Sequence, residues 1–246
     1  MRMTVFAKRN TKEILRDPLN IMFGLGFPLV VLGLLTAIQT SIPVNLFELD
    51  QLTPGIVVFG LSFLTLFAAQ LIAKDRTGAL LTRLLTTPLK PADYILGYLL
   101  PVLPIALAQG LICYLAAGVL GLGLGSSLIG AVLILIIIAP FFIGLGLLCG
   151  SIFNDKQVGG ICGALLTNVS AWLSGTWFDL ELVGGAFKQI AYLLPYVHAV
   201  ELERAVLAGD WSGIFPHIWW VLGYDAAILS AAIFAFMKCG RKSDGV

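Results

Sequence analysis

Long apolar runs alternate with short polar connections along the whole chain. Each run has about twenty predominantly apolar residues, the length that an α-helix needs to cross the hydrocarbon core of a bilayer. The pattern predicts six membrane-spanning helices, at residues of about 19–40, 53–73, 94–120, 127–152, 158–176 and 214–237. No connection is long enough to fold alone, so we expect an all-α membrane protein in which residues 1–246 form a single transmembrane domain.

The amino-acid composition agrees with this pattern. Hydrophobic residues make up 59% of the chain and charged residues 12%, whereas soluble domains contain about 45–50% and about 25%. The excess of apolar residues is larger than a buried core accounts for. The four cysteines are widely spaced without a C-x-x-C pair, so we expect small buried side chains rather than a zinc site or a disulfide framework.

Basic residues are distributed unevenly among the connections. Thirteen of the fifteen lysines and arginines lie in four segments, which are residues 1–17, 74–94, 154–157 and 238–246. By the positive-inside rule these four segments face the cytoplasm, and the connections that hold the other two basic residues face outward. We therefore expect a multi-pass protein of the cytoplasmic (inner) cell membrane with both termini in the cytoplasm.

The charged segment 74–94 contains a short amphipathic pattern between the second and third predicted spans. Four leucines fall on one helical face, namely Leu80, Leu81, Leu84 and Leu85. Pro88 ends this helix, and Pro91 keeps the next residues from resuming it at once. A short helix with an apolar face in the cytoplasm needs cover, so it either lies on lipid headgroups or docks into another protein.

Two other polar regions predict helices that do not cross the membrane. The tail 1–17 carries Met3, Phe6, Ala7 and Ile14 roughly on one face and predicts an interfacial helix, with a solvated tail as the alternative. A helix start follows, with Asp17 as the cap and Pro18 at the first position. Residues 177–213 are acidic and rich in aromatic side chains, and too polar to span. There we expect two short helices, at about 180–192 and 196–208, that re-enter the membrane partway.

The fifth predicted span carries small residues at every fourth position. They are Gly159, Gly163, Thr167, Ala171 and Gly175, and an adjacent face carries Asn168, Trp172 and Thr176. Such a stripe lets two helices approach closely, which fits either packing within the chain or a dimer seam or translocation path. Ser62, Thr65 and Gln70 of the second span are further candidates for lining that path.

The sequence contains no pattern for catalysis. It has no G-x-x-x-x-G-K-[ST] loop, no H-E-x-x-H and no G-x-S-x-G. His198 and Glu201 have metal-pair spacing, but two ligands do not make a site. Asp225 is the only Asp, Glu, Lys or Arg inside a predicted span, and it either meets a structural partner or takes part in substrate passage. We expect no enzyme, no catalytic, cofactor-binding or metal-binding residues, and no nucleic-acid partner.

Three stretches resemble the membrane subunits of type-2 ABC exporters, the ABC-2 type permeases. They are residues 74–98, residues 173–210 and the basic tail that leads through Arg16, Asp17 and Pro18 into the first span. The resemblance implies an N-terminal elbow helix on the inner surface, a coupling helix at 76–89 and a re-entrant helical pair at 178–208. It implies docking on a separately encoded ATP-binding cassette subunit through Arg76, Thr77, Leu80, Leu81, Leu84, Leu85, Thr87, Pro88 and Leu89.

The resemblance also implies a mode of action. Such permeases work as dimers, here most simply a homodimer in membrane lipid, with two ATPase subunits that bind ATP and magnesium and drive export. The tail and first loop are poorer in aromatic residues than in the subgroup that exports polysaccharides, which favours an amphiphilic small molecule, a peptide or a lipid-like cargo. The alternatives are an ATP-independent secondary transporter or channel, which predicts an inverted repeat and several intramembrane charges, and a non-transporting scaffold.

Overall fold

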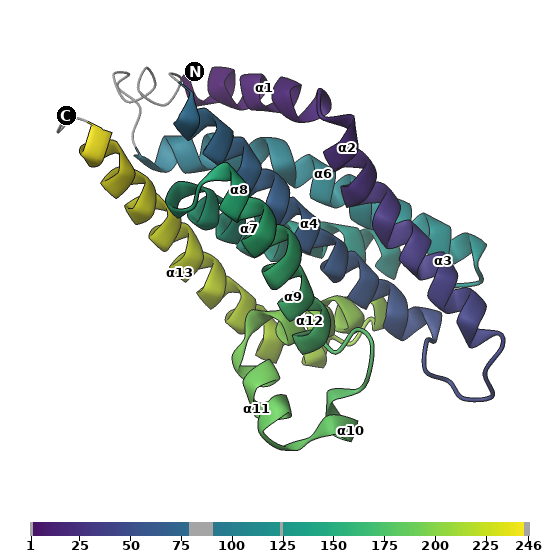
Figure 1. Ribbon diagram of the computed structural model, residues 1–246. Coiled ribbons are helices and arrows are strands. Elements are labelled where there is room, and N and C mark those ends of the chain that lie inside the picture. The colour runs from purple at the N-terminus through teal and green to yellow at the C-terminus, as the bar shows by residue number, and fades with distance from the viewer. Residues whose placement is uncertain (1, 79–90, 124, 244–246) are drawn as a thin grey trace.

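The computed structural model describes residues 2–78, 91–123 and 125–243, and every regular element in these ranges is helical (Figure 1). Two stretches, η1 and η2, are π-helical. The first elements are α1 (Arg2–Leu15), α2 (Pro18–Ile21), η1 (Met22–Gly26), α3 (Phe27–Gln39), α4 (Leu49–Thr77), α6 (Pro91–Val119) and α7 (Ser127–Ile152). They are followed by α8 (Asp155–Val158), η2 (Gly159–Leu166), α9 (Thr167–Leu173), α10 (Leu180–Val183), α11 (Gly185–Leu193), α12 (Pro195–Ala208) and α13 (Trp211–Ser243).

Five helices among the described residues are long and apolar enough to cross a membrane. They are Met22–Gln39, Leu49–Arg76, Ala92–Val119, Ser127–Ile152 and Trp211–Lys238. These ranges agree within a few residues with the first, second, third, fourth and sixth predicted spans. The chain is therefore a multi-pass membrane protein with an all-helical fold.

The fifth predicted span has a different form and is not one of these five helices. Residues 155–173 form α8, η2 and α9 in direct succession, so this helical rod begins and ends three residues before the predicted 158–176 and is π-helical in its middle. A capping box between Asn154 and Gln157 starts it. The chain turns at Gly175, whose φ of 70° is in the left-handed region, which ends the helix before Thr176.

Helix α4 runs through the middle of the bundle, with α3 and α13 on opposite sides (Figure 1). Every residue from 52 to 62 is buried. Such a run covers three helical turns, so this half of α4 contacts protein on every face. By contrast, α3 and α13 expose large apolar side chains, among them Val30, Leu34, Trp219 and Phe234. In a membrane protein, exposed apolar faces of this kind face lipid.

The two termini lie at the same end of the bundle, which we call the terminal end, and α10 to α12 lie at the opposite end, which we call the far end (Figure 1). At the terminal end, the predicted helix in residues 1–17 is present as α1, which buries Phe6, Asn10 and Ile14. Asn10 Nδ2 donates a hydrogen bond to the Gly97 carbonyl oxygen of α6 at 2.9 Å. The backbone N–H of Asn20 donates to Asp17 Oδ1 at 3.2 Å, so Asp17 caps α2 as predicted.

The prediction of one helix at about 180–192 is wrong, because that stretch is broken into α10 and α11. Gly184, which separates the two helices, and Gly185, the first residue of α11, have φ of 61° and 57°. Only glycine adopts this conformation readily, and it cannot continue a right-handed helix. The second predicted helix is confirmed as α12, which begins at Pro195 and ends before Gly209, whose backbone is left-handed.

Candidate functional site

A charged cluster joins three helices at the terminal end. Asp75, near the end of α4, accepts two hydrogen bonds from the guanidinium of Arg9 on α1, at 2.5 and 2.8 Å. The Tyr98 hydroxyl of α6 donates to the same carboxylate at 2.9 Å. The Asp75 side chain is only 6% exposed, and a buried carboxylate is stable only with partners of this kind. The cluster ties α1 to the two helices that border residues 79–90.

Most of the predicted docking residues lie outside the described part of the chain. They are Leu80, Leu81, Leu84, Leu85, Thr87, Pro88 and Leu89, while Thr77 is the last residue of α4. Arg76 is described, and its Nη1 donates to the carbonyl oxygens of Gly150 and Phe153 at 2.7 and 3.1 Å. These carbonyls end α7, where a cation is favourable. The guanidinium of Arg76 thus ties α4 to α7, and the docking role stays a prediction.

A second polar contact region lies at the corner between α1 and α4. Lys74 Nζ is 3.6 Å from Asp17 Oδ2. Asn20 Nδ2 donates to Asp17 Oδ2 at 2.9 Å and to Gln70 Oε1 at 3.0 Å. The Gln70 side chain, a sequence candidate for the translocation path, therefore faces the start of the first span rather than the centre of the bundle.

The two polar candidates in the middle of α4 are buried in packing contacts. Thr65 Oγ1 donates to the Phe142 carbonyl oxygen of α7 at 2.9 Å, and Ser62 Oγ donates to the Phe59 carbonyl oxygen of its own helix at 2.6 Å. Both side chains are less than 3% exposed. In this conformation they satisfy backbone carbonyls and do not line an open path.

The predicted stripe on residues 158–176 divides between two environments. Gly163 faces the Leu66 side chain of α4, and Thr176 is buried against Gly55 of α4. Gly159 is exposed and has no neighbour where a Cβ atom would lie. Asn168 and Trp172 are also exposed, and Trp172 is 56% accessible. One side of this rod therefore packs inside the chain, and the other side is free to contact a partner or lipid.

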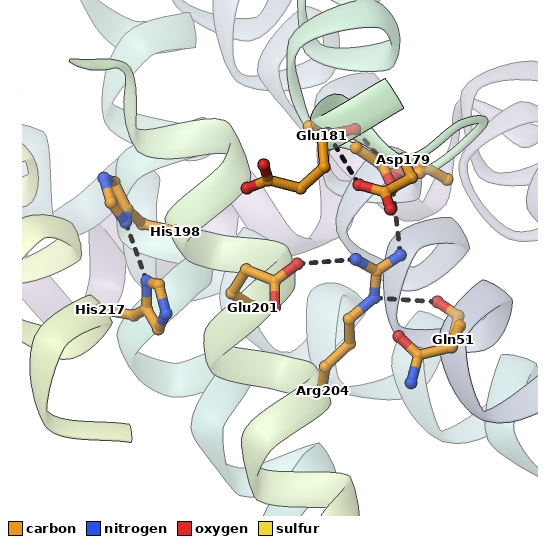
Figure 2. A network of polar contacts seen from close by, with 10 residues as sticks. Gln51, Asp179, Glu181, His198, Glu201, Arg204 and His217 are labelled. Atoms are coloured by element: carbon orange, nitrogen blue, oxygen red, sulfur yellow. Dashed lines mark hydrogen bonds and ion pairs between the residues drawn. The ribbon is translucent and has the colours of Figure 1, made fainter. Parts of the chain in front are cut away.

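Arg204 of α12 holds the far end together (Figure 2). Its Nε donates to the Gln51 carbonyl oxygen at the start of α4, at 3.2 Å, and its Nη2 donates to the Gly175 carbonyl oxygen at 3.1 Å. Its Nη1 donates to Glu201 Oε1 at 2.7 Å. One side chain therefore connects α4, α12 and the turn that follows α9.

A cavity of about 480 Å³ opens beside Arg204 at the far end. Its lining combines aromatic rings with charged and amide groups, including Gln51, Trp177, Phe178, Asp179, Glu201 and Arg204. The volume is within the range of about 300–1,000 Å³ that is typical of ligand pockets. Aromatic faces with polar groups at their edges suit an amphiphilic or polyhydroxylated molecule.

Two histidines that are nineteen residues apart in sequence meet at the far end (Figure 2). His198 Nε2 lies 2.9 Å from the Tyr192 carbonyl oxygen, which only accepts, so Nε2 carries a proton. His198 Nδ1 lies 2.9 Å from His217 Nδ1, which must then be the donor if His198 is neutral. The Trp220 indole stacks on His198 at 4.8 Å. Burial lowers the pKa of His198 below its ordinary value of 6.5 and favours this neutral arrangement.

Two buried carboxyl groups differ in how they are paired. Glu203 of α12 accepts a hydrogen bond from the Tyr114 hydroxyl of α6 at 2.7 Å, while its second oxygen has no hydrogen-bond partner in the described part of the chain. Burial raises the pKa of Glu203 to about 8, an effect that the Tyr114 hydroxyl partly offsets. Asp225 of α13 is buried, and its Oδ1 has no partner among the described residues. The structural partner considered for Asp225 is therefore not found in these ranges.

Sequence reasoning missed Asp75, Arg204 and Gln51. Asp75 stands between Lys74 and Arg76 at the end of a span, a signal that its carboxylate has a positive partner. Arg204 follows Glu201 by three residues on a helix, which predicts their ion pair but not the contacts with Gln51 and Gly175. No group of three or more His, Cys, Asp or Glu side chains in the described ranges is placed to hold a metal ion.

Comparisons with known proteins agree with this architecture. A family model described as ABC-2 type transporter matches residues 2–208. The capsule polysaccharide export inner-membrane protein CtrC of Neisseria meningitidis serogroup B is 30% identical over 112 residues, which cover 45% of this chain and 41% of that protein. This chain thus matches less than half the length of that relative. No solved structure matches the chain significantly. Because the family model covers most of its residues, the chain belongs to the ABC-2 type transporter family.

Proposed function

We propose that this chain is the transmembrane permease subunit of an ATP-binding cassette exporter, which moves its cargo outward with ATP that a separate subunit hydrolyses. Membership of the ABC-2 type transporter family across residues 2–208 is the observation that carries the proposal. The sequence has no phosphate-binding loop of the Walker A type. ATP and magnesium therefore belong on the partner ATPase, which docks on residues 76–89.

Helix α4 supplies a physical route from that docking segment to the far end. It extends over 29 residues, or about 43 Å at the rise of an α-helix. Asp75 and Arg76 tie one end to α1, α6 and α7, and the Gln51 carbonyl at the other end accepts from Arg204. A displacement applied to the segment that follows α4 is passed along a stiff, enclosed helix to the wall of the far-end cavity.

In this proposal the terminal end, including both termini, faces the cytoplasm. The basic residues of α1, of residues 74–94 and of the turn at 154–157 support that orientation. Helix α1 is then the elbow on the inner surface, residues 155–173 make a sixth crossing, and α10 to α12 re-enter from the outer side. An ATP-independent transporter is the weaker alternative, because Asp225 is the one Asp, Glu, Lys or Arg within the predicted spans.

The proposed assembly contains two copies of this chain. The exposed side of residues 155–173, with Gly159, Asn168 and Trp172, is the candidate seam because small residues permit close helix approach there. Oxidation of an Asn168→Cys variant in membranes is expected to cross-link two copies, whereas Val30→Cys on the exposed face of α3 is not. Equal cross-linking by both variants would remove this face as the seam.

We propose an amphiphilic small molecule, a peptide or a lipid-like compound as the cargo. A polysaccharide is the second candidate, because the relative CtrC is named for capsule polysaccharide export and because Trp177 and Phe178 stand beside Asp179 and Glu201 in the far-end cavity. Transport of a labelled oligosaccharide and of a labelled amphiphile into inverted vesicles that contain the complex distinguishes the two. The cargo that accumulates only with ATP is the correct one.

The docking assignment is tested by charge substitution in the leucine face. Leu81→Asp and Leu84→Asp are expected to abolish co-purification with the ATPase subunit, or stimulation of its activity, while membrane insertion stays intact. Leu120→Asp is the matched control, since Leu120 is an exposed leucine at the far end. Unchanged coupling in the Leu81→Asp complex contradicts the assignment, and cargo movement without any ATPase contradicts the proposed function as a whole.

A further inference from the structure

An apolar groove lies under α1 at the terminal end, apart from the predicted docking segment and the far-end cavity. Its volume is about 410 Å³. One wall is the side of α1 that carries Ala7, Thr11 and Leu15, and the opposite wall is a stripe of α6 from Leu100 to Ala108. Ile21 of α2 and Leu25 of η1 also line the groove.

The groove exists because its walls carry small side chains where α1 crosses α6. The buried face of α1, formed by Phe6, Asn10 and Ile14, holds α1 against α6. Beside that face, Ala7 and Thr11 of α1 line the same space as Pro104 and Ala108 of α6. Large side chains at Thr11 or Ala108 would fill that space.

The contents of this groove must be hydrocarbon. Two of its walls, the start of the first span and α6, belong to helices long and apolar enough to cross the membrane. Leu15 and Leu100 line it and remain 65% and 41% exposed within the chain. Exposed leucines in a concave site at the membrane surface are covered by lipid chains, because water there is costly for apolar area.

The rim of the groove is positively charged. Lys8 lines it, and Lys12 lies one turn further along α1. Both side chains are exposed, and no carboxylate in the described part of the chain forms an ion pair with either of them. Basic residues at a membrane surface attract anionic lipid headgroups. An apolar slot with an ammonium group at its mouth matches a molecule that has an acyl chain and a phosphate.

We propose that the groove under α1 is a binding site for an anionic phospholipid, with an acyl chain in the slot between α1 and α6 and the headgroup phosphate on Lys8 and Lys12. The site rests on the proposed placement of α1 at the inner membrane surface, and it is independent of cargo and of the ATPase. A bound lipid would fix the angle at which α1 leaves the membrane, and so also the Arg9 contact with Asp75.

Native mass spectrometry of the purified chain tests this site. We expect the wild-type protein to retain phosphatidylglycerol about fivefold more than phosphatidylcholine with the same acyl chains, an effect of the size that one basic residue has near an anionic surface. Thr11→Trp and Ala108→Trp fill the slot from opposite walls and should lower retention of both lipids. Ala226→Trp, at an exposed position of α13, is the matched control and should retain them.

The headgroup contact is tested separately. Lys8→Gln combined with Lys12→Gln should remove the preference for phosphatidylglycerol but keep acyl-chain binding, while Lys156→Gln at an exposed position of α8 should change neither. Thermal unfolding establishes that each variant is folded. If Ala108→Trp does not fold, Thr11→Trp alone tests the slot. Wild-type retention in folded slot variants, or equal loss in Ala226→Trp, overturns the proposal. Either result leaves the test of ATPase docking at Leu81 unaffected.

Discussion

The two ends of this bundle are held together in different ways. At the terminal end, α1, α4, α6 and α7 are joined by an enclosed carboxylate, Asp75, and by Arg76 on the end of α7. At the far end, Arg204 donates to two backbone carbonyls beside a cavity of about 480 Å³. The first arrangement is dense and suits a joint that receives a force. The second concentrates several contacts on one side chain and suits a region that opens.

The largest effect is expected at the dense end. Asp75→Ala removes the acceptor of Arg9 and Tyr98 and leaves a half-buried guanidinium without its carboxylate. We expect a loss of about 2–3 kcal/mol of stability, less than for a fully buried pair because Arg9 can take up water. Thermal unfolding in detergent measures it, with Glu13→Ala on the exposed face of α1 as the control. A double-mutant cycle with Arg9→Ala should show strong coupling between the two residues. Additive losses of stability would contradict the role of the Asp75–Arg9 ion pair in joining these helices.

A smaller loss of global stability is expected when Arg204 is removed, but the chain near residues 174–184 should open more readily. Arg204→Ala removes the hydrogen-bond donor of the Gln51 and Gly175 carbonyls. We expect the free energy of unfolding to fall by about 1–2 kcal/mol. Limited proteolysis within residues 174–184 should become faster, while α1 stays protected. Lys188→Ala is the control, because its ion pair with Glu181 is exposed and contributes little. If Arg204→Ala made proteolysis faster by the same factor at both ends of the bundle, the two ends would not differ in how they are held together.

The smallest effect is expected from acidification, and only at the far end. Burial holds the pKa of His198 below 6.5. Below pH 6.5 this imidazole is therefore protonated in the unfolded chain but still neutral in the folded chain, so the His198 contribution to stability falls. Glu201 nearby favours protonation, whereas His217 opposes it. Glu203 on the same helix acts in the opposite direction, because its raised pKa makes the folded chain bind a proton first as the pH falls. In a Glu203→Gln background the protection factors of α12 amides should therefore fall between pH 7.5 and pH 5.5, with those of α1 unchanged. His217→Gln should alter this response, and an unaltered profile would show that the pair is not responsible.

Much of this architecture is predictable from hydrophobic pattern. The fourth span agrees with its prediction at both boundaries, residues 127–152, because its apolar run has sharp polar borders. The Asp17 cap and the Pro195 helix start follow from local backbone chemistry and are confirmed. The single helix at 180–192 was wrong because adjacent glycines allow two left-handed residues, a preference that apolar periodicity does not report.

The candidate site was much less predictable. Ser62 and Thr65 are polar residues inside a span, and the same residues suit a path or a packing contact until the neighbouring helix is placed. The structure gives Thr65 the Phe142 carbonyl of α7 as its acceptor. Asp75 and Arg9 are separated by 66 residues, so their ion pair exists only because α1 packs on α6, next to the end of α4.

By itself the sequence determined the class of this protein, its membrane-crossing runs and the distribution of its positive charge. These properties depend on residues that are close along the chain and on the low solubility of apolar side chains in water. Only the tertiary structure decided that α4 is enclosed, that Arg204 meets Gln51 and that an apolar groove lies beneath α1. Contacts of this kind join residues that are far apart in sequence, and they depend on how helices pack, which no local pattern encodes.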